Sequence, residues 1–233
     1  EGDSAARLQA LVSPFVLRRV KEDVVADLPE KIEDTVVAQL TGEQRKLYLA
    51  NQDRIAQQVQ HREASEFKKD KLKVLAELTK LRQICCDPRL HYEDYKAGSA
   101  KLDTCMELVH GALDGGHRIL LFSQFTGMLD IIGQRLAKED IAFLKLTGAS
   151  SKESRAKMVA QFQAGEVPVF LISLKAGGVG LNLTAADVVI HYDPWWNVAA
   201  QDQATDRAHR IGQQHTVTVY KLIAKDTIEE RIM

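Results

Sequence analysis

The sequence predicts an α/β fold, a parallel sheet with flanking helices, together with an N-terminal helical region. In residues 98–225, short apolar segments alternate with longer segments of helical periodicity. The segment 119–122 is apolar throughout, and the segments 167–172 and 188–192 are largely so, which is typical of strands that are buried on both faces. Helices between such strands imply crossover connections and therefore parallel pairing. Because 45% of the 233 residues are hydrophobic, the chain has enough apolar side chains for a full core.

Residues 1–97 are mostly helical in pattern and rich in charge, and we interpret them as a linker and helical insertion. Thr41 and Gln44 match a capping box, in which each side chain satisfies a free amide at the start of a helix. The expected elements are a helix over 5–27, a strand over 32–40, a helix from residue 41 towards residue 60, and a helix over 68–86.

Residues 98–225 follow with a regular alternation of helices and strands. Ser99 is placed to cap the first helix, and Ser150 with Glu153 matches a second capping box, whose helix Gly165 ends. A last helix is expected from Asp226, within residues 226–233. The other expected elements are helices to about 113 and over 126–138 and 197–209, and strands over 119–122, 142–146, 167–172, 188–192 and 216–223.

Composition limits the classes of function. The net charge is −1, so any contact with nucleic acid must be local. The three cysteines do not form a disulfide framework, which indicates a reducing compartment. No apolar run approaches the ~20 residues of a spanning helix, so we expect no membrane partner and an intracellular protein. The chain starts abruptly inside a helical pattern, as a piece of a longer protein would.

Polar residues follow three of the predicted strands. Ser123 and Gln124 follow the strand over 119–122. Residues 173–178 follow the strand over 167–172, and residues 193–197 follow the strand over 188–192. In parallel sheets, ligands bind at the carboxyl ends of the strands. Ser123 and Gln124 could donate to DNA phosphates, or Ser123 could simply cap the following helix.

Arg207 and Arg210 are three residues apart, so on a helix they would project from one face. Two guanidinium groups at this spacing suit contact with phosphate oxygens. The alternative is a solvated helix face with ion pairs to Asp202 and Asp206. Spacing alone leaves both open.

Residues 173–182 are rich in glycine, and glycines let backbone amides approach an anion closely. The segment lacks the Gly-Lys-Ser/Thr ending of a phosphate-binding loop. A tight strand-to-helix turn is the alternative explanation.

A zinc site is disfavoured. Cys85, Cys86, His91 and Cys105 are the candidate ligands, but adjacent cysteines are poor tetrahedral ligands and no Cys-x-x-Cys pair exists. His209 is better interpreted as a structural residue than as a catalytic base. Trp195 fits ordinary packing.

The segment Gln203–Gln213 reads Gln-Ala-Thr-Asp-Arg-Ala-His-Arg-Ile-Gly-Gln and is similar to the sixth helicase motif of Swi/Snf ATPases. The resemblance covers almost the whole chain, in order. Asp87 stands where the family usually has His, and Val198 where it has Pro. The other matching segments are Phe15–Val24, Leu28–Lys31, Leu81–Pro88, Ser99–Leu102, Ile119–Phe125, Leu146–Gly148, Leu171–Thr184, Asp193–Asn197 and Thr227–Ile232.

The resemblance implies a RecA-like lobe over 98–225 and the start of a C-terminal brace helix over 226–233. It implies that Arg207 and Arg210 act as catalytic fingers on the γ-phosphate of ATP. The implied nucleotide-binding residues are Gly180, Asn182 and Gln203. The implied DNA-binding residues are Ser123, Gln124, Gly148, Ser173, Lys175, Gly177 and Trp196.

In such a family, this chain would be the second motor lobe of an ATP-dependent double-stranded DNA translocase and remodeller. ATP and Mg²⁺ would be bound mainly by an N-terminal helicase lobe of the same polypeptide, so the chain alone would be inactive and hold no metal. A DNA-bound protein target is a further implied partner, in the nucleoid or cytoplasm of a bacterium or in a eukaryotic nucleus. The alternatives are a catalytically inactive DNA-binding or interaction module and an RNA helicase lobe.

Overall fold

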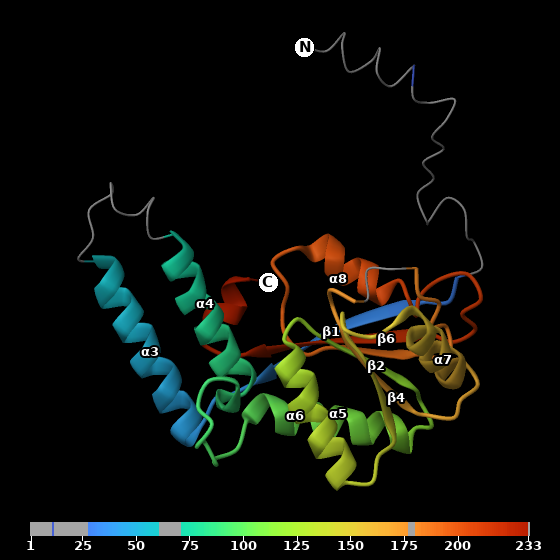
Figure 1. The fold of residues 1–233 in the computed structure, drawn as a ribbon, viewed down its shortest axis with the longest axis horizontal. Helices are drawn as coiled ribbons and strands as arrows, with labels where there is room; N and C mark the ends of the chain where they lie inside the picture. The colour runs from blue at the N-terminus through green and yellow to red at the C-terminus, as the bar shows by residue number, and fades with distance from the viewer. Residues whose placement is uncertain (1–10, 12–27, 61–70, 177–179, 233) are drawn as a thin grey trace.

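A computed structural model describes residue 11 and residues 28–60, 71–176 and 180–232. Six parallel strands form one sheet in the order β1-β6-β5-β2-β4-β3 (Figure 1). The predicted α/β class with a parallel sheet is therefore confirmed. The elements are β1 (Lys31–Ala38), α3 (Gly42–Gln60), α4 (Lys71–Cys86), η1 (Pro88–Leu90), α5 (Ala100–Asp114), β2 (Ile119–Ser123), α6 (Thr126–Lys138), β3 (Phe143–Leu146), α7 (Lys152–Gln163), β4 (Val169–Ser173), β5 (Val188–His191), α8 (Val198–Thr205), β6 (Val217–Ala224) and η2 (Ile228–Arg231).

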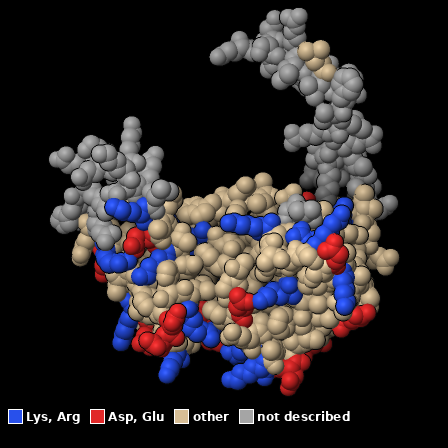
Figure 2. Space-filling model, viewed as in Figure 1, with Lys and Arg blue, Asp and Glu red and all other residues tan. Residues whose placement is uncertain are grey.

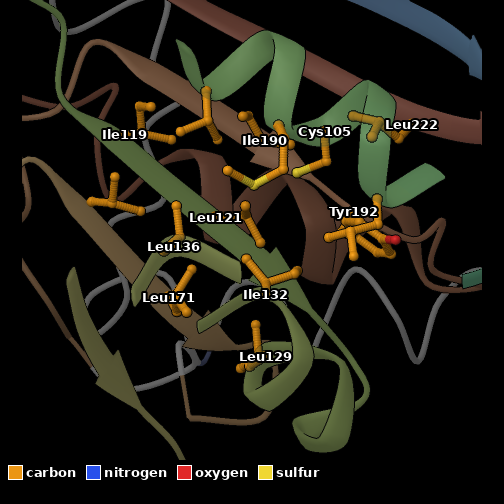
Figure 3. Packing of buried hydrophobic residues seen from close by; sticks show 14 of the residues in the cluster. Cys105, Ile119, Leu121, Leu129, Ile132, Leu136, Leu171, Ile190, Tyr192 and Leu222 are labelled. Carbon is orange, nitrogen blue, oxygen red and sulfur yellow. The ribbon is translucent and has the colours of Figure 1, made fainter. Parts of the chain in front are cut away.

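Helices cover both faces of the sheet. Successive side chains of a strand point to opposite faces, and in β2 this divides two apolar clusters. Ile119 and Leu121 pack with α5 and α6 in one cluster (Figure 3). Leu120 and Phe122 belong to the other cluster, with side chains of α7 and α8. Because both faces are covered, the central strands β2, β4 and β5 are buried along their whole length, as the sequence predicted.

The segment 31–38 joins the sheet, although the sequence placed it in the linker and helical region. β1 pairs along its whole length with β6, from Lys31 opposite Val217 to Ala38 opposite Ala224. It is the edge strand and is mostly exposed, so its sequence carries no strong apolar signal. The sheet therefore extends beyond the 98–225 boundary.

The helices α3 and α4 lie side by side at one end of the sheet (Figure 1). A third apolar cluster fixes them there, and it includes Tyr48 of α3, Ile84 of α4 and Ala224 of β6. The backbone N–H of Ile228 also donates to the Tyr48 hydroxyl at 2.8 Å. The helical region and the C-terminal segment are thus packed into one structure with the lobe.

Both predicted capping boxes are wrong. The Gln44 side chain does not return to its own helix but donates to Ile84 O at 2.9 Å and accepts from Ala100 N at 3.1 Å. This buried bridge between α4 and α5 satisfies the amide better than a solvent-exposed cap would. The cap of α7 is Ser151, which accepts from Ser154 N at 3.1 Å. The Ser150 hydroxyl instead accepts from Thr147 N.

Two other local predictions are confirmed, and the C-terminal helix is shorter than expected. Ser99 caps α5 as expected, and Gly165 has φ +79 just after α7. The C-terminal segment forms the short 3₁₀ helix η2, capped by Thr227, where a longer helix was expected. Of the helix expected over 5–27, only Leu11 is among the described residues, and it is helical.

Candidate functional site

Most of the predicted site residues that the structure describes lie at two places, which α8 connects. The segment 193–197 leaves the carboxyl end of β5 and leads into α8, and the chain after α8 enters the amino end of β6. Because the strands are parallel, these two ends lie at opposite edges of the sheet. We call the residues at the first place the carboxyl-edge group, namely Ser123, Gln124, Gly148, Ser173, Lys175 and Trp196. We call residues 206–212 the arginine turn.

Part of the carboxyl-edge group lines a cavity of about 420 Å³. Its lining includes four of the predicted DNA-binding residues, Gln124, Gly148, Ser173 and Lys175. They come from the ends of β2, β3 and β4, which are neighbours in the sheet. The fold therefore collects residues that are far apart in the sequence. Gly177 falls outside the described residues.

Ser123 uses its hydroxyl inside the protein. The side chain is fully buried, donates to Asp193 Oδ1 and accepts from Phe125 N at 3.1 Å. The Asp193 carboxylate also accepts from Gln124 N at 3.3 Å. Burial raises the pKa of Asp193. Ser123 thus fixes the segment after β5 to the segment after β2.

Ser173 is similarly engaged, because it is 3% exposed and its hydroxyl accepts from Ala176 N at 3.3 Å. Lys175 is exposed and Gln124 is half-buried. Trp196 has 57% of its surface exposed, whereas Trp195 is half-buried, consistent with the packing role expected for it. A ligand at this edge would first meet Lys175, Gln124 and Trp196.

The arginine turn is not helical, so the prediction that Arg207 and Arg210 share one helix face is wrong. The helix α8 ends at Thr205, and Asp206 forms its C-cap. The chain then turns so that Arg207 O accepts from Leu183 N at 3.0 Å. This tertiary hydrogen bond replaces the next helical one.

Arg207 is buried and incompletely paired. It is 8% exposed, and its Nε is buried and has no hydrogen-bond partner among the described residues. The pKa of Arg207 is lowered by burial and then by the charge of Arg210. A buried donor without a partner lowers stability by about 1–3 kcal/mol, and by more when the group is charged. An anion placed here would relieve both the unpaired donor and the repulsion between the two arginines.

Arg210 connects the turn to the glycine-rich segment 173–182. Its Nη1 donates to Leu181 O at 3.2 Å. Leu181 lies between Gly180 and Asn182, both exposed and both predicted to bind nucleotide. Gly180 has φ +38, which favours glycine. The structure thus brings Gly180 and Asn182 beside the two arginines.

Gln203 lies apart from this group, on the exposed face of α8. With Asn197, Asp202 and Asp206 it lines a shallow cavity of about 430 Å³.

Two supporting residues received no role from the sequence. Gln213 is 6% exposed, and its Nε2 donates to Thr184 O, Ala186 O and Ala208 O at 2.8–3.1 Å. His191 of β5 bonds through Nε2 to Thr205 Oγ1 at 2.8 Å. Gln213 ends the Arg-Ile-Gly-Gln string, which was the one available signal. His191 offered none, because its partner is distant in the sequence.

The predicted structural role of His209 agrees with its contact, because Nε2 lies 2.8 Å from Pro29 O. Cys85, Cys86 and Cys105 are all buried, and burial raises the pKa of the Cys105 thiol to about 12. Among the described residues, no group of three or more His, Cys, Asp or Glu could hold a metal ion. Within the same part of the chain, no helix is long and apolar enough to cross a membrane.

The face in Figure 2 mixes Lys and Arg with Asp and Glu, without a broad field of one sign. Any electrostatic attraction of a charged ligand to this face must therefore be local.

Comparison with known families gives two matches. Residues 100–212 match the helicase conserved C-terminal domain, and residues 1–90 match the SNF2-related domain. A curated relative from Mycoplasma pneumoniae, named as an uncharacterized ATP-dependent helicase, is 41% identical over 97% of this chain. The chain spans 22% of that relative's length.

Solved structures agree. The SWI2/SNF2 ATPase C-terminal domain of Sulfolobus solfataricus is 35% identical, with a TM-score of 0.73 over 87% of this chain and 83% of that one. The Sulfolobus solfataricus SWI2/SNF2 ATPase core in complex with dsDNA is 38% identical, with a TM-score of 0.76 over 97% of this chain and 48% of that one.

Proposed function

Because this chain belongs to the SWI2/SNF2 ATPase family and corresponds to its C-terminal lobe, we propose that it is the second motor lobe of an ATP-dependent double-stranded DNA translocase. The observation that carries the proposal is the arginine turn, where a buried, incompletely paired Arg207 lies next to Arg210. Such a pair is suited to the charge of a transferring phosphoryl group.

In this proposal, Arg207 and Arg210 contact the γ-phosphate from the side of this lobe. Their donors stabilise negative charge that develops on the phosphoryl oxygens in the transition state. Gly180 and Asn182, which the Arg210–Leu181 hydrogen bond holds nearby, contact the ribose. Gln203 lies on the exposed face of α8 and would reach the nucleotide only from there.

The carboxyl-edge group would contact the DNA backbone. Lys175, Gln124 and Gly148 line one cavity, with Trp196 exposed on the neighbouring segment. Contacts to phosphate position a duplex without reading its sequence, so binding would be non-specific and sensitive to salt. Ser123 and Ser173, both buried, would act mainly by shaping this edge. DNA as the partner implies an intracellular site of action.

We propose that ATP and Mg²⁺ are held mainly by the first lobe. A phosphate-binding Gly-Lys-Ser/Thr sequence does not occur in the 233 residues. The chain alone should therefore not hydrolyse ATP.

The test compares this chain alone with the parent protein, by which we mean the proposed longer polypeptide that contains both lobes. We expect ATP hydrolysis by the parent, stimulated by duplex DNA and not by duplex RNA, and none by the 233-residue chain. Equal stimulation by both nucleic acids would favour an RNA helicase lobe. A parent that binds DNA but does not hydrolyse ATP would favour an inactive DNA-binding module.

A further inference from the structure

Arg82 lies on α4, in the helical region, and its side chain contacts the segment 193–197. It is 4% exposed, and its Nη2 donates to Pro194 O at 2.5 Å. Its guanidinium carbon is 5.5 Å from the centre of the Trp196 ring and 5.8 Å from that of Phe125. Both distances are within the range of cation–π attraction. One side chain of the helical region thus contacts two segments at the carboxyl edge.

The same carbonyl oxygen has a second donor, because Gln124 Nε2 lies 3.5 Å from Pro194 O. Pro194 is therefore the point where the segments after β2 and β5 meet α4. Arg82 also attracts the buried Asp193 carboxylate. Removing the guanidinium would remove the cation–π contact with Trp196 and leave Pro194 O with only the long hydrogen bond from Gln124.

Stability alone does not explain an arginine at this position. The Arg82 Nε is buried and has no hydrogen-bond partner among the described residues. A buried cation with an unsatisfied donor is often less stabilising than an apolar side chain of similar size. A planar guanidinium can stack on an aromatic ring while donating in its own plane, which neither Lys nor Met can do.

We propose that Arg82 is a positioning residue that holds Trp196 and Gln124 in their DNA-facing arrangement and so couples the α3–α4 region to the DNA track. This proposal rests on the proposed function for its DNA part. Its structural part, the restraint of Trp196, stands independently of that function.

The restraint can be measured in this chain itself, which has only two tryptophans. In a Trp195→Phe background, all tryptophan emission comes from Trp196. We expect Arg82→Met to increase the nanosecond rotation of the Trp196 ring in time-resolved anisotropy. The matched control is Arg54→Met, which removes an exposed ion pair between α3 and α4 at the same hairpin. Unchanged ring motion in Arg82→Met would overturn the proposal.

The consequence for DNA can be measured in the parent ATPase by titration with duplex. We expect Arg82→Met to raise the duplex concentration for half-maximal stimulation about tenfold, with a much smaller change in maximal turnover. Arg82→Lys, which keeps the charge and the stem, should remain impaired because it cannot stack and donate together. If Arg82→Met fails to fold, Arg82→Lys decides the question by the same two measurements.

A purely structural Arg82 would lower the melting temperature without moving the half-saturating duplex concentration, and that result contradicts the proposal. If the unsubstituted parent shows no stimulation by duplex, the proposed function fails. The anisotropy measurement still decides whether Arg82 restrains Trp196.

Discussion

The carboxyl-edge group and the arginine turn differ in whether their buried polar side chains are hydrogen-bonded within the protein. At the carboxyl edge, the buried hydroxyls of Ser123 and Ser173 are already bonded within the protein. In the arginine turn, the buried Arg207 keeps a donor without a partner. The two serine hydroxyls therefore have their partners within this lobe, whereas Arg207 retains a donor that is available to an anion. This difference agrees with the proposal that the carboxyl edge contacts DNA and that the arginine turn contacts nucleotide.

The largest expected effect concerns the arginine turn. In the parent protein, Arg207→Ala and Arg210→Ala should each reduce DNA-stimulated turnover by roughly 10³- to 10⁵-fold, the range for arginine fingers. The melting temperature and most DNA affinity should persist, because the lost contact acts mainly in the transition state. Steady-state hydrolysis measures the turnover, and thermal melting measures the melting temperature.

Lysine should not restore either position fully, since a point charge cannot make a two-pronged contact. Arg45→Ala, an exposed arginine on α3, is the control. Turnover within a few-fold of the unsubstituted protein in both alanine variants would remove the distinction between the two regions.

A second prediction concerns the ion pair beneath the carboxyl edge. Lys101 and Glu229 are fully buried and 2.8 Å apart, and Lys101 lies near Asp193 and the Tyr192 ring. Burial alone would lower the pKa of Lys101, but the attraction of Glu229 raises it above its usual value. Removing one partner leaves the other charge buried, so Lys101→Met should lower the free energy of unfolding by roughly 3–5 kcal/mol.

The double variant Lys101→Met with Glu229→Gln should recover part of that loss, because no isolated charge remains. Denaturant melts of the four proteins of this cycle give the coupling. A double variant as unstable as the sum of the single variants would contradict the expectation.

The third prediction is for pH, through the His191 contact that joins β5 to the end of α8. Burial lowers the pKa of His191 to about 3, from 6.5. Between these values the unfolded chain binds a proton that the folded protein does not, so stability falls as pH drops below 6.5. The expected loss is about 1.4 kcal/mol per pH unit, or roughly 2 kcal/mol by pH 5.

Unfolding of the chain at pH 7, 6 and 5 measures this slope, and the variant His191→Gln isolates it. The variant should be less stable at pH 7 but should lose less stability on acidification. Parallel pH profiles for the two proteins would mean that His191 is not held neutral in the folded state.

The fourth prediction tests Ser123. Because its hydroxyl bonds to the buried Asp193, Ser123→Ala should destabilise the chain by roughly 1–2 kcal/mol. Its effect on DNA affinity should be small at temperatures where the protein is folded. If Ser123 instead donated directly to a DNA phosphate, the variant would keep its stability but lose affinity for DNA. The carboxyl edge would then resemble the arginine turn in leaving a donor available to a ligand.

The smallest expected effect is at the exposed Lys175. Lys175→Ala should weaken duplex binding by a few-fold at every sequence and reduce the slope of log K against log salt by about one unit. Titration of labelled duplexes at two or more salt concentrations measures both. Lys152→Ala, an exposed lysine at the start of α7, serves as the comparison. A loss confined to one DNA sequence would contradict a phosphate contact.

Much of this protein is determined by features that are local in the sequence. The buried central strands, the Ser99 cap and the stop at Gly165 each depend on a few neighbouring residues. The gathering of Gln124, Ser173 and Lys175 followed from one rule, since parallel strands end at the same edge, whereas Gly148 was expected from the family resemblance. The motifs themselves identified the family.

Tertiary structure decided what depends on partners far along the chain. Gln44 fitted a cap locally, but a bridge to Ile84 O and Ala100 N lies 40 and 56 residues away and replaced it. The helical spacing of Arg207 and Arg210 gave way because Leu183 N draws the chain out of α8. The exposed β1 found its place only by pairing with β6. For Gln44 and for the arginine turn, a tertiary hydrogen bond outweighed a local preference of about 1 kcal/mol, because an unsatisfied buried polar group costs more than a lost cap or helical turn.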